Sequence, residues 1–60
     1  MTNDVAAIVT LANDREMSLA GMVRMAAHHH AAGRLTEWRA WRRAAIVRFP
    51  SRNVPTGYGV

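Results

Sequence analysis

The segment from residue 19 to residue 32 constrains this chain most, because as a helix it is apolar on nearly every side. Its only polar side chains are one arginine and three consecutive histidines. A helix that is apolar all round is usually buried all round. A hairpin of two helices cannot cover such a segment, so the sequence predicts that oligomerisation or a partner completes the fold.

The first half of the chain predicts an all-α protein, either a helical hairpin or three short helices. Residues 1–49 form the expected small helical domain. Apolar side chains recur every three or four positions and keep one phase, which favours a single helix over about 5–32. The polar run at 13–17 allows a break instead, with Asp14 or Ser18 capping a second helix.

The second half predicts another helix over 37–49, with Thr36 as its N-cap and Pro50 ending it. A strand is the alternative over 44–49, where residues that favour strands gather. Two prolines and two glycines follow in residues 50–60, which predicts an extended C-terminal tail. We expect this tail to dock on other helices or on another chain through Arg52 and Tyr58.

Positive charge is concentrated in the C-terminal half. The net charge is +4, and six of the eight arginines follow residue 33. Arg39, Arg42 and Arg43 fall on one side of the second predicted helix. They form either a solvated face or a surface for an anionic partner, which is nucleic acid, an acidic protein or an anionic membrane.

Large apolar side chains suggest where the chain packs. The tryptophans and the phenylalanine of the second helix share a face beside its arginines, and three further residues lie in the apolar segment. We interpret them as packing anchors, although aromatic rings beside arginines also stack on nucleic-acid bases. The predicted interface or packing anchors are Leu19, Met22, Val23, Trp38, Trp41 and Phe49.

No set of residues resembles a catalytic or cofactor site. The chain has no cysteine, and no serine or histidine has a third group placed to orient it. Three consecutive helical residues point about 100° apart, so residues 28–30 cannot converge on one metal ion. The sequence therefore predicts a non-enzymatic protein without metal or cofactor, and these histidines are expected simply to finish a helix.

Two short segments resemble known families. Residues 29–35, within the segment 18–41, look like the end of a recognition helix entering a wing in small helix-turn-helix excisionases. Residues 52–60 are similar to the basic, Pro-Gly-aromatic tails of small phage head–tail joining proteins. The resemblances imply a DNA-binding regulator and a phage-encoded assembly protein respectively, and no residue roles are carried over from either.

Two functions follow as expectations. The first is a small helical interaction protein, a structural or regulatory subunit of a larger assembly, with a protein partner or self-association. The alternative is a small basic regulator that binds nucleic acid through its arginine-rich helix. No apolar run is long enough for a transmembrane segment and the N-terminus lacks a basic signal start, so we expect a cytoplasmic protein, or a virion protein if phage-encoded.

Overall fold

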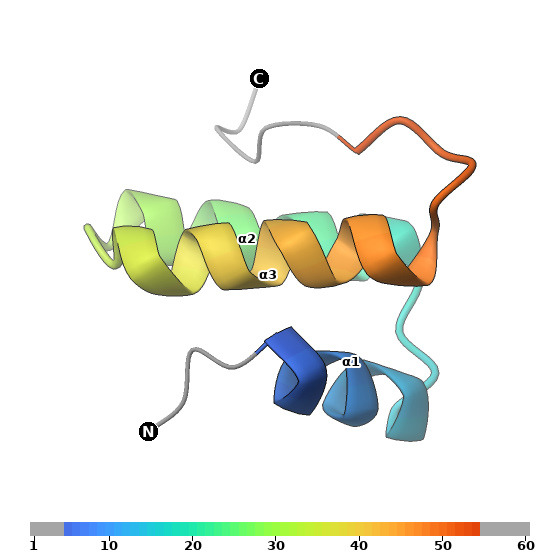
Figure 1. Cartoon of the computed structure of the whole chain (residues 1–60). Coiled ribbons are helices and arrows are strands. Elements are labelled where there is room, and N and C mark those ends of the chain that lie inside the picture. Colours follow the sequence, from blue (N-terminus) through green and yellow to red (C-terminus); the bar gives the residue numbers. More distant parts are fainter. Residues whose placement is uncertain (1–4, 55–60) are drawn as a thin grey trace.

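The computed structural model describes residues 5–54 and consists of three helices (Figure 1). They are α1 (Val5–Asp14), α2 (Leu19–Ala31) and α3 (Leu35–Arg48). The prediction of an all-helical chain is confirmed in its three-helix form. The described part of the chain contains no strand, so the strand alternative over 44–49 is wrong.

A short loop separates α1 from α2, so the favoured single helix over 5–32 is wrong. Glu16 adopts a left-handed backbone conformation with φ of 52°, which ends the first helix. The side chain of Ser18 then accepts a 3.1 Å hydrogen bond from the backbone N–H of Gly21 and caps α2. The apolar periodicity continues across the break, but two separate helices form because the break lets α1 turn back and pack on α3.

The turn between α2 and α3 depends on Gly33, whose φ of 80° is left-handed. Its N–H donates to the carbonyl of His30 at 3.0 Å, and the N–H of Arg34 donates to the carbonyl of His29 at 2.9 Å. This pair of bonds is a Schellman motif, which satisfies carbonyl groups at the helix end. The sequence therefore ends α2 where a glycine can take the required conformation.

Helix α3 begins earlier than expected. Arg34 occupies the N-cap position without a side-chain cap, and Leu35 is the first helical residue. The prediction that Thr36 caps a helix starting at residue 37 is therefore wrong. The N–H of Trp38 donates to the carbonyl of Arg34 at 3.0 Å, so helical bonding already begins at that residue. The wing implied by the excisionase resemblance is likewise absent from the described residues, because the chain passes directly into α3.

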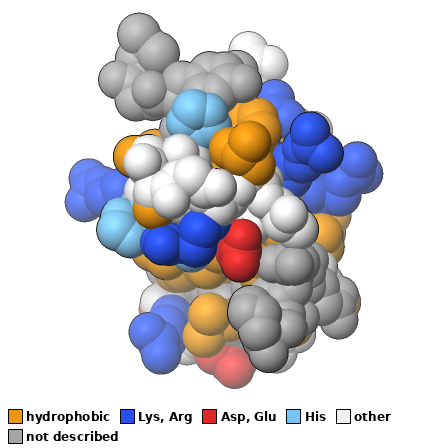
Figure 2. Space-filling model, turned by 90° about the vertical axis from the view of Figure 1, so that its left-hand side faces the viewer, with side chains coloured by type: hydrophobic (Ala, Val, Ile, Leu, Met, Phe, Trp, Pro, Cys, Tyr) orange, Lys and Arg blue, Asp and Glu red, His pale blue; other side chains and the backbone are white. Residues whose placement is uncertain are grey.

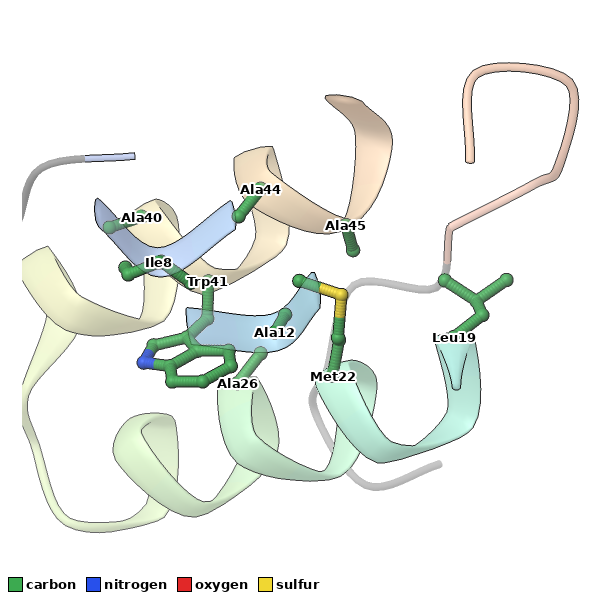
Figure 3. Packing of buried hydrophobic residues seen from close by; sticks show 9 residues of the cluster. All are labelled: Ile8, Ala12, Leu19, Met22, Ala26, Ala40, Trp41, Ala44 and Ala45. Carbon is green, nitrogen blue, oxygen red and sulfur yellow. The ribbon is translucent and has the colours of Figure 1, made fainter. Parts of the chain in front are cut away.

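Helix α3 is the central element of the fold. It lies antiparallel beside α2, and α1 packs against it from another side, whereas α1 and α2 scarcely touch (Figure 1). The core is small, and five of its nine residues are alanines, which let the helices approach closely (Figure 3). The core residues are Ile8, Ala12, Leu19, Met22, Ala26, Ala40, Trp41, Ala44 and Ala45.

Within the single chain, α2 is not buried on every side. It buries one face, through Leu19, Met22 and Ala26. Its fully exposed positions carry alanine, Arg24 and His28, and no large apolar side chain of α2 is exposed. Alanine has little apolar surface, so exposing it costs little. Completion of the fold by oligomerisation or a partner remains a prediction.

The chain turns back after α3. The N–H of Arg52 donates to the carbonyl of Phe49 at 3.1 Å, which closes a turn. Val54 is partly buried against the core. The side chain of Arg52 is exposed, and Tyr58 lies outside the described residues. Docking of residues 50–60 on another chain stays a prediction, as does the domain boundary at residue 49.

Candidate anion-binding surface

The candidate site lies on the outer face of α3, which is defined by what the helix buries. Ala40, Trp41, Ala44 and Ala45 point into the core. Because each residue turns the helix by about 100°, a different set of side chains faces away from α1 and α2. The outer face of α3 comprises Leu35, Arg39, Arg42, Arg43 and Ile46.

The structure brings the three predicted arginines together in one pocket. Arg39, Arg42 and Arg43 line it with Trp38 and Ile46, and its volume is about 250 Å³. This volume is below the range of drug-sized ligand sites, which begins at roughly 300 Å³. The pocket therefore suits a single side chain or a phosphate group better than a whole cofactor.

Arg42 is the most constrained arginine of the three. Its side chain is half-buried, and its Nε is fully buried with no hydrogen-bond acceptor among the described residues. A buried donor without an acceptor costs roughly 1–3 kcal/mol. The free protein therefore carries one buried, unmet hydrogen-bond donor at Arg42.

The positive charge of this surface is not neutralised within the described part of the chain. Arg39 and Arg43 are exposed, and none of the three arginines forms an ion pair with an acidic side chain of residues 5–54. Glu37 is the only acidic residue on α3. Figure 2 shows basic side chains at several places on the face in view, some of them beside hydrophobic ones. The outer face of α3 therefore has a positive potential that attracts anions.

Apolar side chains border the arginines on the same helix. Leu35 is 48% exposed, Ile46 is 43% exposed and Val47 is 55% exposed. Trp38 is half-buried at the edge of the pocket. Arginine and aromatic residues are enriched in protein–protein interfaces, and apolar area is greatest at their cores. The surface therefore combines residue types that are enriched in protein–protein interfaces.

Two histidine rings of α2 contact the two tryptophan rings of α3. The ring of His29 stacks on Trp41 with centroids 6.3 Å apart, and His30 meets Trp38 edge-on at 5.1 Å. Sequence reasoning missed these contacts and assigned the histidines only to the helix end. A sequence signal existed only for His30 and Trp38, which lie three and five residues from Gly33, whereas His29 and Trp41 lie four and eight residues from it.

His29 also accepts a hydrogen bond. The Nε of Arg34 donates to its Nδ1 at 2.9 Å. Burial lowers the pKa of His29 below its ordinary value of 6.5, the positive charges of Arg34 and His28 lower it further, and Glu37 opposes the shift. An Nδ1 that accepts a bond is unprotonated, so the neutral ring suits this geometry.

The remaining predicted residues are placed within the fold rather than at the pocket. Leu19, Met22 and Trp41 are buried, whereas Val23, Trp38 and Phe49 are partly buried against the core. Among the described residues, no group of three or more His, Cys, Asp or Glu side chains can hold a metal ion. No described helix has the length and apolar content needed to cross a bilayer.

Compared with known proteins, the chain matches no family model, no curated protein and no solved structure.

Proposed function

We propose that the protein is a non-enzymatic helical interaction module that binds an anionic partner through the outer face of α3. In this role it serves as a small structural or regulatory subunit of a larger assembly. The observation that carries the proposal is the pocket in which Arg39, Arg42 and Arg43 meet Trp38 and Ile46. This surface combines positive charge and apolar area on a helix whose opposite face packs in the core.

The charge of the surface also suggests which partners fit. Pairing of two copies through their α3 outer faces would place arginine against arginine, and like charges repel. The charge therefore favours a different molecule, or a different surface of a second copy, as the binding partner. An acidic protein segment supplies both carboxylates for the arginines and apolar groups for Leu35 and Ile46.

A polyanionic peptide tests the proposal. Poly-glutamate labelled with a fluorophore is titrated with the protein, and binding is followed by anisotropy. We expect binding that weakens as salt rises, because charge attraction between exposed groups is screened. Absence of binding at low ionic strength would contradict the proposal.

Charge reversal locates the binding site. The double variant Arg39→Glu with Arg43→Glu changes two exposed side chains and should retain the helical circular dichroism of the wild type. We expect it to lose binding to poly-glutamate. The control Arg24→Glu changes an exposed arginine on α2 and should reduce affinity only slightly, through net charge. Equal losses in both variants would place the site elsewhere.

A second candidate function is a nucleic-acid-binding regulator. The half-buried ring of Trp38 beside three arginines favours it, since bases stack on such rings while arginines meet phosphates. Binding to duplex DNA should then fall with salt at a log–log slope of roughly −0.9 per phosphate contacted. Replacing Arg39, Arg42 and Arg43 by alanine should make that slope shallower by the equivalent of about three phosphate contacts. An unchanged slope would exclude this function.

A further inference from the structure

We infer that the partner segment is an acidic amphipathic helix that lies along α3, with carboxylates at its centre and one apolar side chain near each end. This inference rests on the proposed function and names its partner. It is carried by the order of side chains on the outer face of α3, in which apolar residues lie at both ends and arginines lie between them.

The order follows from helical spacing. Leu35, Arg39, Arg42 and Ile46 are separated by four, three and four residues, so they form one stripe along the helix. Spacing of this kind is how a helix presents a seam to another helix. A helical partner therefore contacts all four side chains at once, which an irregular segment does less readily.

The length of the stripe sets the length of the partner. Leu35 and Ile46 lie near the two ends of α3, and a rise of 1.5 Å per residue separates them by about 16 Å. Both side chains are more than two-fifths exposed, so each offers apolar surface to a partner. The matching helix needs at least three turns, with its two apolar residues about eleven positions apart.

The arginines at the centre of the stripe favour a carboxylate on the partner helix. Arg39 and Arg43 are exposed, and both line one pocket with Arg42. A carboxylate accepts two parallel hydrogen bonds from one guanidinium, which gives position as well as affinity. One or two glutamates in the middle of the partner helix would neutralise this part of the surface.

Other occupants match the stripe less well. The phosphates of a nucleic acid satisfy Arg39 and Arg42 but offer no aliphatic contact to Leu35 and Ile46. The α3 helix of a second copy would place its own arginines against these arginines. Of the occupants compared, a chain that is both acidic and apolar is the one that satisfies the ends and the centre of the stripe together.

Two synthetic peptides of identical composition test the inference. The first is a helix of about 18 residues with leucines eleven positions apart and glutamates between them. The second has the same residues scrambled so that the leucines lie on opposite sides. We expect the ordered peptide to bind at least five-fold more tightly. Equal, salt-sensitive binding of both would leave the proposed function standing and overturn the inference, whereas binding of neither would overturn both.

Variants of the apolar ends provide the second arm. Leu35→Ser with Ile46→Ser should reduce the preference for the ordered peptide to less than two-fold. The matched control is Val47→Ser, because Val47 is an equally exposed apolar residue of α3 outside the stripe. It should keep the full preference. An unchanged preference in the double variant would overturn the inference, as would tighter binding of duplex DNA than of the ordered peptide.

Discussion

The guanidinium of Arg48 donates a 2.6 Å hydrogen bond to the backbone carbonyl of Met17. Its Nε also donates to the side-chain oxygen of Asn13 at 2.8 Å, and its Nη1 lies 3.3 Å from the sulfur of Met22. The side chain of Arg48, at the end of α3, is therefore hydrogen-bonded both to the end of α1 and to the loop before α2. Arg48 serves the fold and differs from the arginines of the pocket.

Replacing Arg48 should destabilise the protein more than replacing an exposed arginine does. Arg48→Met keeps an unbranched apolar stem but removes charged hydrogen bonds to Met17 and Asn13, which should cost about 2–3 kcal/mol. Urea denaturation followed by circular dichroism measures the change. The control Arg24→Met lies at an exposed position of α2 and should change stability by less than about 0.5 kcal/mol. Equal effects of the two substitutions would show that the Arg48 contacts contribute little.

The two glycines of the described chain should respond to alanine in opposite directions. Gly33 has a φ of 80°, so Gly33→Ala should cost about 1–2 kcal/mol although no atom lies within 4 Å of the added carbon. Gly21 lies in α2, where the new carbon would meet only ordinary contacts at 3.5 and 3.6 Å. Gly21→Ala should therefore stabilise by roughly 0.5–1 kcal/mol. Thermal unfolding of both variants checks the signs, and stabilisation by Gly33→Ala would contradict the turn geometry.

Stability should fall in mild acid because of His29. Burial and the charges of Arg34 and His28 lower its pKa, so the unfolded chain takes up a proton before the folded chain does. The contribution of His29 is complete above about pH 6.5 and is lost as the pH falls through the lowered pKa of the folded state. Melting temperatures measured between about pH 7.5 and about pH 5 should show this loss. His29→Gln should be less stable at neutral pH but should lack this part of the pH dependence; an unchanged pH profile would contradict the assignment.

Substitution of Arg42 should have opposite effects on the stability of the free protein and on partner binding. Arg42→Met removes a buried N–H that lacks an acceptor, and should raise the stability of the free protein by about 1 kcal/mol. The same substitution should weaken binding of the ordered acidic peptide, because it removes a charged donor. Arg39→Met changes an exposed residue and should weaken binding with little effect on stability. If Arg42→Met destabilised the protein and bound normally, Arg42 would be a packing residue.

The all-helical class could be predicted from sequence, whereas the arrangement of the helices could not. Periodicity and caps identified helical segments, and Ser18 was one of two caps proposed for a break before α2. The choice between one helix and two depended on tertiary packing, because α1 gains its contacts only by folding back on α3. Ala40 and Ala44 were not anticipated as core residues, since alanine gives little hydrophobic signal even where helices pack closely.

The site was only partly predictable. Helical spacing grouped Arg39, Arg42 and Arg43 correctly on one side of α3, because that grouping depends on local geometry alone. Contacts across the turn were missed, including those of His29 and His30 with the tryptophans. The tertiary role of Arg48 was also invisible, because its partners lie far away in the sequence.

The most direct test of the account is a map of where an anionic partner binds. Amide signals of ¹⁵N-labelled protein are recorded by NMR during titration with poly-glutamate. We expect the largest shifts to lie in residues 38–47, around the pocket of α3, with small shifts in α1. Shifts spread evenly over all three helices, or concentrated in α1 or α2, would contradict the claim that the outer face of α3 is the binding surface.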